Sequence, residues 1–180
     1  MNDNEPILKK TVEVHVTHLE MTRPPRQRFS VPSKPRLAMM RATNIPTHFY
    51  RYIYSQVGRP HHWFLRHKMD DPALAELINS ENCHIDILLA DGCVAGFYEL
   101  SLEHMPERVS LEYFGMMPDY QGMGIGKWFL AEALFAAWQY EPSKVSVNTN
   151  TLDHPAALPL YQKLGFSPIS VSDDTIEIWE

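Results

Sequence analysis

The chain has 180 residues, of which 44% are apolar and 21% are charged, and its formal net charge is −6. This length and composition fit one compact globular unit, and the lack of any run of about 18 apolar residues excludes a helical membrane protein. The negative net charge disfavours a nucleic-acid partner, because nucleic acid is itself an anion.

Residues 1–36 are predicted to form a short strand followed by a proline-rich arm. The first residues are polar and lack the apolar stretch of a secretory signal, so we expect a cytoplasmic location. Val12, Val14 and Val16 alternate with polar residues, which indicates a half-buried strand at the edge of a sheet. Residues 23–36 contain four prolines and few apolar residues, which predicts an extended connector.

Positive charge is concentrated in the first part of the chain. Residues 1–68 hold twelve of the 16 Lys and Arg but four of the 22 Asp and Glu. These cations are interleaved with proline and polar residues rather than aligned on one helix face, so we expect neither a nucleic-acid nor a membrane partner. The acidic remainder suits a cationic amine substrate, although ordinary solubility explains its acidity equally well. The role of the arm and the oligomeric state stay open, since the strand and arm offer a surface for a homodimer.

Residues 37–180 are predicted to form a single α/β domain. In chain order the pattern predicts a strand at 37–41, a helix from a Thr43 or Asn44 cap to about Val57, a helix at 71–78, and strands near 85–89, 94–103 and 109–116. Asp91-Gly92 is a hairpin turn signal, so the three strands form an antiparallel meander. Cys83 and Cys93 flank that turn without facing each other, so we predict no disulfide. The nine histidines lack HExxH or zinc-finger spacing, and we predict no metal site.

Helix and strand alternate in the second half of this domain. The pattern predicts a helix from Ile125 that ends before Pro142, a strand at 145–147, a helix from Pro155 to a Gly165 C-cap, and closing strands at 166–171 and 175–179. Pro159 is compatible with that helix only in its first turn, so the helix begins late or bends. The elements together predict a mixed, mostly antiparallel sheet of six or seven strands flanked by about four helices.

The segment from Tyr113 to Lys127 runs from a strand end through a glycine-rich turn into a helix. The amides of such a turn and of the first helical residues lack internal acceptors, so they form an anion site that glycine leaves open to a diphosphate. The turn is not a P-loop, because Trp128 follows Lys127 where Ser or Thr is required. It is not a dinucleotide-binding loop either, because GxGxxG would place its last glycine at Lys127 or Phe129.

The sequence QGMGIG matches the Q/R-x-x-G-x-G/A signature of the GNAT superfamily of acetyltransferases, with Gln121, Gly124 and Gly126 at the defining positions. MMPDY before it resembles the strand end of that family, and NTLDHPAALPLYQKLGF, residues 150–166, resembles its second cofactor-side motif. Over residues 37–179 the chain is thus similar to a bacterial GNAT N-acetyltransferase. The resemblance implies the GNAT fold, acetyl-coenzyme A as acetyl donor, and cofactor contacts from Met116, Met117, Gln121, Gly122, Met123, Gly124, Ile125, Gly126, Lys127, Asn150, His154, Ala157 and Tyr161.

An alkylammonium group must lose a proton before its nitrogen attacks a thioester, so the site needs a base. Glu112 lies on the strand that leads to the glycine turn. If residues 104–107 form the preceding hairpin loop, Glu103 pairs with Arg108 and Glu99 lies directly opposite Glu112. Two adjoining carboxylates would raise the pKa of one member and attract a cation. Which of Glu99 and Glu112 acts as the base stays open, and a solvated structural carboxylate is the alternative for Glu99.

The resemblance adds the backbone N–H of Met116 as a donor to the thioester oxygen and Tyr161 as a proton donor to the thiolate, unless Tyr161 only covers the sheet. Asp153 is expected to cap the following helix. His62 and Trp63 are weaker candidates for substrate binding, beside Glu99 and Glu112. We therefore predict an N-acetyltransferase that acts on a primary amine of a small molecule by direct attack in a ternary complex. The alternatives are a non-catalytic acyl-coenzyme A-binding regulatory module and an acetyltransferase acting on a protein or peptide amine.

Overall fold

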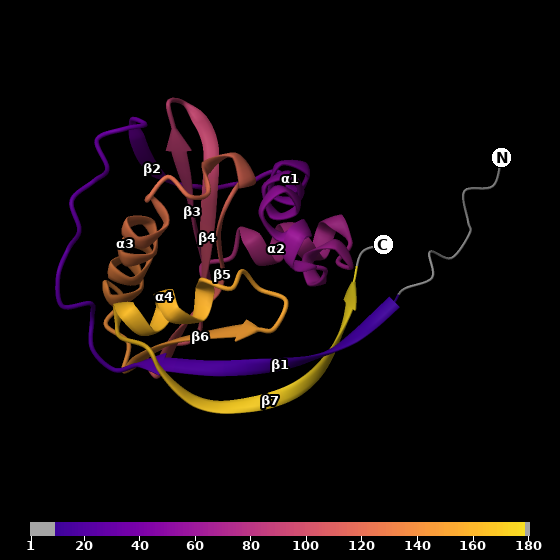
Figure 1. Cartoon of the computed structure of the whole chain (residues 1–180). Helices are drawn as coiled ribbons and strands as arrows, with labels where there is room; N and C mark the ends of the chain where they lie inside the picture. The colour runs from indigo at the N-terminus through magenta and orange to yellow at the C-terminus, as the bar shows by residue number, and fades with distance from the viewer. Residues whose placement is uncertain (1–9, 179–180) are drawn as a thin grey trace.

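The computed structural model describes residues 10–178, which form one sheet with helices on both faces (Figure 1). The sheet has seven strands in the order β2-β3-β4-β5-β6-β1-β7. The strands are β1 (Lys10–Met21), β2 (Leu37–Arg41), β3 (Cys83–Ala90), β4 (Cys93–His104), β5 (Arg108–Met116), β6 (Lys144–Asn150) and β7 (Ser167–Ile178). The α-helices within this range are α1 (Thr47–Gly58), α2 (Asp71–Ile78), α3 (Gly126–Trp138) and α4 (Ala157–Leu164). The predicted mixed α/β sheet is confirmed.

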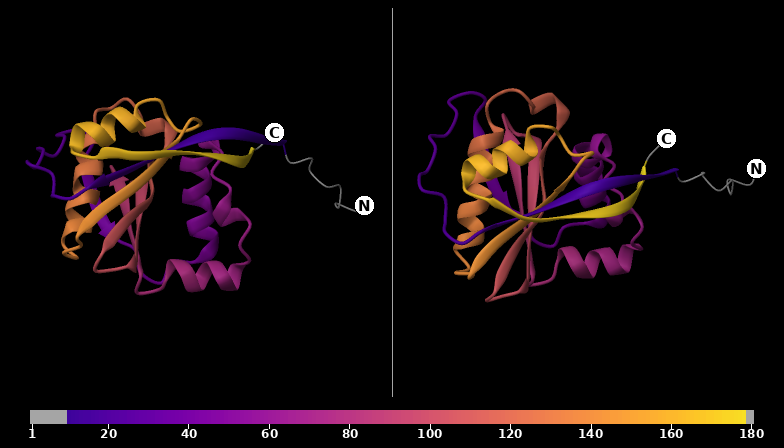
Figure 2. Two further views of the ribbon diagram at one scale, coloured as in Figure 1. Left: turned by 90° about the horizontal axis from the view of Figure 1, so that it is seen from below. Right: turned by 60° about the horizontal axis from the view of Figure 1, so that its bottom comes forward.

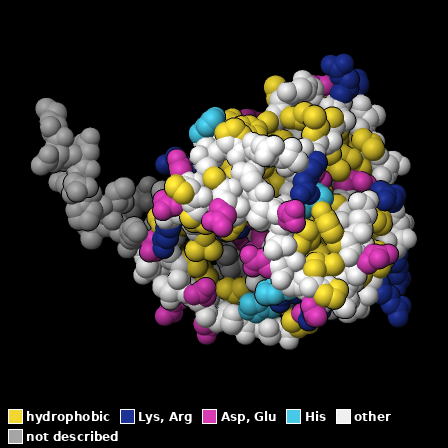
Figure 3. All heavy atoms as spheres, turned by 180° about the vertical axis from the view of Figure 1, so that it is seen from behind, with side chains coloured by type: hydrophobic (Ala, Val, Ile, Leu, Met, Phe, Trp, Pro, Cys, Tyr) yellow, Lys and Arg dark blue, Asp and Glu magenta, His cyan; other side chains and the backbone are white. Residues whose placement is uncertain are grey.

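The sheet separates two apolar cores. Helices α1 and α2 cover one face, and α3 and α4 cover the other (Figure 2). Tyr50 and Phe97 belong to the first core, whereas Leu100 and Phe129 belong to the second. Both faces of β4 are therefore buried, which explains why its sequence reads as a continuous apolar run. None of the described helices is long and apolar enough to cross a bilayer, and acidic and apolar side chains are interspersed over the face seen in Figure 3.

Strand β1 lies inside the sheet, between β6 and β7, so the predicted edge position is wrong. Val16 of β1 is opposite Asn150 of β6 on one side and Ser172 of β7 on the other. The two predicted closing strands are one continuous strand, β7, which pairs with β1 along its length and forms a sheet edge. Figures 1 and 2 show β1 and β7 as a long curved ribbon that reaches toward α1 and α2.

The predicted turns match the structure better than the predicted helix caps. Asp91 and Gly92 have φ angles of 48° and 88°, as a type I′ hairpin turn requires. Gly165 has a φ of 114° and ends α4 in the left-handed conformation. Helix α1, in contrast, begins after Pro46, so the Thr43 and Asn44 caps are wrong. Cys83 and Cys93 are free thiols, as predicted.

The register of the β4–β5 hairpin differs from the predicted one. Glu99 pairs with Tyr113 rather than with Glu112, and Arg108 pairs with His104 rather than with Glu103. The register shifts between Glu99 and Leu100, which leaves Glu112 as the extra residue of a bulge on β5. The predicted pairing of two carboxylates is therefore wrong, because the bulge reverses the alternation of side chains along β5.

Candidate active site

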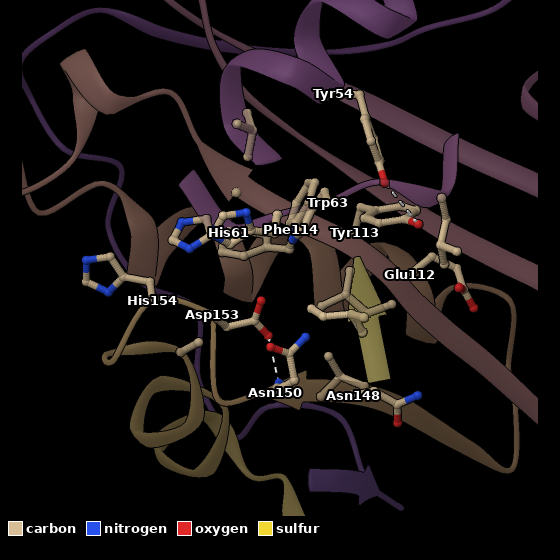
Figure 4. Close-up of a pocket in the computed structure, with 18 of the residues that line it drawn as sticks. Tyr54, His61, Trp63, Glu112, Tyr113, Phe114, Asn148, Asn150, Asp153 and His154 are labelled. Carbon is tan, nitrogen blue, oxygen red and sulfur yellow. Dashed lines mark hydrogen bonds between the residues drawn. The ribbon is translucent and has the colours of Figure 1, made fainter. Parts of the chain in front are cut away.

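A cavity of about 820 Å³ opens beside the carboxyl end of β5 and is lined by segments that lie far apart in the sequence. Its walls come from the loop after α1, the end of β5, the glycine turn, the start of α4 and the far ends of β1 and β7. Figure 4 shows His61, Asp153 and His154 toward one end, and Tyr54, Tyr113 and Glu112 toward the other. Cavities that hold small molecules have volumes of roughly 300–1,000 Å³, so this one has room for more than one small group.

The cavity lies where two parallel strands separate. Pairing between β5 and β6 runs from Arg108 opposite Lys144 to Leu111 opposite Val147, and the strands diverge beyond that point. The amide of Met117 donates to the carbonyl oxygen of Ala95 on β4 at 2.8 Å. Because successive amides of a strand point to opposite sides, the amide of Met116 points away from β4. The Met116 N–H thus faces the gap between β5 and β6, and Met116 lines the cavity.

The glycine turn has the open backbone that an anion site needs. Gly122 and Gly124 have φ angles of 74° and 75°, and an added Cβ at either position, or at Gly126, would have no atom within 4 Å. The helical hydrogen bonds of α3 begin with the amide of Phe129, which donates to the Ile125 carbonyl oxygen at 3.0 Å. The earlier amides of the helix are therefore free to bind a ligand. The Gln121 side chain donates to the Met116 carbonyl at 3.2 Å, which fixes the turn to the strand end.

Not every residue that the resemblance assigns to the cofactor reaches the cavity. Those that line it are Met116, Gln121, Gly122, Gly126, Asn150, His154, Ala157 and Tyr161. Those that do not line it are Met117, Met123, Gly124, Ile125 and Lys127. Met117 and Ile125 are core residues, since they are 6% and 0% exposed. The ammonium group of Lys127 lies over the ring of Phe29 in the proline-rich arm, 3.9 Å from its centroid.

The turn between β6 and α4 forms the end of the cavity that Figure 4 shows around Asn150 and Asp153. The Asp153 carboxylate accepts from the amide of Asn150 at 2.9 Å and from the Thr149 hydroxyl at 2.8 Å. Asp153 therefore closes this turn, and its predicted role as the cap of α4 is wrong, because Ala156 occupies the N-cap. Tyr161 is buried in α4 and lines the cavity. Burial and the charge of Asp153 raise the pKa of Tyr161, so its phenol stays protonated at neutral pH.

Glu112 is the extra residue of the bulge, lies at the margin of the cavity that it lines, and is exposed. The residue also lines a second, polar cavity of about 310 Å³ on the sheet face beside Ser110 and Ser146. Desolvation by the surrounding protein and the nearby charge of Glu99 raise the pKa of Glu112 above its usual range. A carboxylate with a raised pKa that is open to a cavity is suited to accept a proton near neutral pH.

Glu99 has a different environment from Glu112. It is 1% exposed and does not line the large cavity. Its carboxylate accepts from the Tyr50 hydroxyl and from the Arg66 guanidinium, both at 2.5 Å. One oxygen of Glu99 is therefore in an ion pair with Arg66 and the other accepts from Tyr50, so Glu112 is the better placed of the two candidate bases.

The loop after α1 brings His62 and Trp63, the predicted substrate residues, into the cavity lining. The sequence pattern missed Tyr54 and Tyr113, and it missed the end of β7, where residues 174–177 line the cavity. Lys68 pairs with Glu177 at 2.9 Å across this end. These residues approach the site only through the pairing of β1 with β7 and the packing of α1, for which the local sequence carries no signal.

Comparison with known proteins agrees with this architecture. A family model described as the acetyltransferase (GNAT) family matches residues 43–166. The solved structures that the chain resembles share the fold, a mixed sheet covered by helices on both faces. The chain belongs to the GNAT family of acetyltransferases.

Three of the similar structures illustrate the range of relatives. A tandem GNAT protein from the clavulanic acid biosynthesis pathway has a TM-score of 0.65 at 16% identity, covering 91% of this chain and 53% of that one. An IAA acetyltransferase from Bacillus cereus has a TM-score of 0.56 at 25% identity, covering 75% and 79%. An aminoglycoside acetyltransferase from an uncultured soil metagenomic sample, in complex with trehalose, has a TM-score of 0.54 at 15% identity, covering 71% and 86%.

The relatives also differ in length. The chain spans 62%, 66% and 53% of three of the structures that it matches over more than nine-tenths of its own length. A search of curated proteins found no match.

Proposed function

We propose that the chain is an N-acetyltransferase that moves the acetyl group of acetyl-coenzyme A to a primary amine of a small molecule. The observation that carries this proposal is that one cavity joins the open glycine turn, the Met116 amide and the Glu112 carboxylate. The turn suits the paired phosphates of the coenzyme, because its free amides and the α3 dipole attract anions and its glycines leave room for them. When bound, acetyl-coenzyme A supplies an acetyl thioester, whose carbonyl carbon the amine attacks.

Three groups of the chain act in the reaction: a base, a hydrogen-bond donor to the thioester oxygen and a proton donor to the sulfur. Glu112 accepts a proton from the bound ammonium, and its position between the two cavities gives that proton a route to solvent. The Met116 amide donates to the carbonyl oxygen as negative charge develops there. Tyr161, whose phenol is protonated at neutral pH, donates a proton to the sulfur when the carbon–sulfur bond breaks, and the second proton that the nitrogen loses as the amide forms restores the phenol. The new carbon–nitrogen bond therefore forms in a direct transfer, with no covalent link to the protein.

Thiol release from acetyl-coenzyme A in the presence of a panel of amines tests this function. Release that depends on both the amine and the protein supports it. If the protein binds coenzyme A but no small amine, peptide or protein causes thiol release, the chain is a regulatory module and the proposal is wrong. If thiol release occurs only with a peptide amine, the acceptor is a protein or peptide rather than a small molecule.

Substitution of Gly126 tests the phosphate site without straining the backbone. Gly126 begins α3 with a φ that any residue adopts, and it lines the cavity. Gly126→Val is expected to weaken coenzyme A binding roughly tenfold or more, because losing one hydrogen bond to a charged group costs about 1.5 kcal/mol. Isothermal titration calorimetry measures the change. Gly126→Ala is the control, since the family signature accepts alanine there, and equal affinities for both variants would contradict the assignment.

The pH dependence of kcat/KM reports on Glu112. The base must be unprotonated, so kcat/KM is expected to rise with pH through the pKa of Glu112, which burial and Glu99 raise and the Arg66 and Arg108 cations lower. The acid limb should therefore lie above the usual range of a glutamate. Changing the amine to one of lower pKa should move only the alkaline limb. An acid limb that follows the pKa of the amine would show that Glu112 is not the titrating group.

A further inference from the structure

Three aromatic rings form one side of the cavity at the end where Glu112 lies (Figure 4). Tyr54, Trp63 and Tyr113 contact one another, with ring centroids 5.5 Å apart for Tyr54 and Trp63, 5.0 Å for Tyr54 and Tyr113, and 4.9 Å for Trp63 and Tyr113. We call these three residues the aromatic wall. Because the rings come from α1, the following loop and β5, the wall exists only in the folded chain.

The aromatic wall is held rigidly from behind. The Tyr54 hydroxyl donates to the Tyr113 hydroxyl at 3.4 Å, and the Arg66 guanidinium lies 5.2 Å from the centre of the Tyr113 ring. Arg66 is fixed in turn by its ion pair with Glu99. Burial raises the pKa of both phenols, so both stay uncharged. Tyr54 is 1% exposed and supports the other two rings from behind, so the ring surface open to the cavity is that of Trp63 and Tyr113. A rigid wall of this kind binds a flat apolar group without a large loss of side-chain entropy.

The cavity lining also includes the apolar Leu65 and the charged residues Lys68, Asp174 and Glu177. Leu65 is 66% exposed although it is apolar, so its side chain is open to a ligand in the cavity that it lines. The Lys68 ammonium is paired with the Glu177 carboxylate. Arg66 already occupies one face of the Tyr113 ring as a cation, so a second cation on the opposite face of that ring is disfavoured. The arrangement therefore places Glu112 next to the ring surface of Trp63 and Tyr113, while Asp174 and the paired Glu177 lie on β7.

We propose that the acceptor is a primary amine carried by an aromatic or similarly bulky apolar group, which lies on the aromatic wall with its nitrogen at Glu112. This inference rests on the acetyl transfer proposed above and specifies its substrate class. Asp174 of β7 also lines the cavity, so a diamine, with one nitrogen at each carboxylate, is the competing class.

Turnover of matched amines distinguishes the two classes. The value of kcat/KM is expected to be at least tenfold higher for phenylethylamine than for ethanolamine or putrescine. One or two methylene groups in an apolar pocket change kcat/KM roughly tenfold, and a whole ring buries more apolar surface than they do. Leu65→Asn is expected to lower the ratio of kcat/KM for phenylethylamine to kcat/KM for ethanolamine roughly fivefold or more, because only the ring loses apolar contact. Met40→Asn is the control, because Met40 is 61% exposed on β2 and does not line the cavity.

A preference for putrescine that Asp174→Asn abolishes would overturn the inference, and so would equal turnover of phenylethylamine and ethanolamine. Acetylation of any of these amines at all would leave the proposed function standing. If no amine is acetylated, calorimetry of phenylethylamine with the coenzyme A-bound protein still decides the inference. Binding that Leu65→Asn weakens and Met40→Asn does not would support it, and the absence of binding would overturn it.

Discussion

Replacing Glu112 with glutamine is expected to lower kcat/KM for amine acetylation by roughly a hundred- to ten-thousand-fold, the range that a positioned general base contributes. Glutamine keeps the shape of the side chain and its place in the bulge but cannot accept the proton of the ammonium. The affinity for coenzyme A should stay the same, because Glu112 is not part of the glycine turn that we propose as the phosphate site. Thiol release and calorimetry measure the two quantities on the same preparation.

Glu103→Gln is the matched control for Glu112→Gln. Glu103 is an exposed carboxylate near the end of β4 that influences the pKa of Glu112 but does not line the large cavity. Its loss should change kcat/KM by only a few-fold, through the weak field of an exposed charge. If Glu112→Gln and Glu103→Gln lower the rate equally, Glu112 acts only through its charge, and its role as base is wrong.

Replacing Glu99 with glutamine is expected to lower the free energy of unfolding by about 3–5 kcal/mol, the cost of removing one partner of a buried ion pair. The Arg66 guanidinium would then keep its charge in a buried site without the carboxylate that it contacts at 2.5 Å. Urea unfolding followed by far-ultraviolet circular dichroism measures the change. Tyr113 should also lose its fixed position, because the Arg66 guanidinium packs against its ring.

A double substitution separates the effect of the two charges on stability from the effect of side-chain packing. Glu99→Gln combined with Arg66→Met leaves no buried charge, so the double variant should be less destabilised than the sum of the two single variants. A sum that is simply additive would mean that the two charges do not stabilise each other.

Local sequence features predicted most of the elements of this fold. The hairpin turn at Asp91-Gly92, the glycine that ends α4 and the late start of α4 around Pro159 all depend on the backbone preferences of single residues. The glycine turn was predicted in the same way, because its open backbone depends on its own residues rather than on distant side chains. The GNAT assignment followed from that turn together with the motif at residues 150–166.

The prediction failed where a residue depends on a partner far away in the chain. The bulge at Glu112 moved this carboxylate out of register with Glu99, and a shift of one residue reverses every side chain beyond it. The alternation of Val12, Val14 and Val16 indicated a strand but gave no sign that β7 pairs along its outer side.

The amino-acid sequence by itself determined where the chain turns, which segments form helices and strands, and which backbone amides are left open for an anion. Only the tertiary structure decided which carboxylate reaches the cavity and which is buried against Arg66, and which aromatic rings meet beside Glu112. The physical reason is that dihedral preferences act within a few residues, whereas burial and charge pairing act between atoms that only the folded chain brings together.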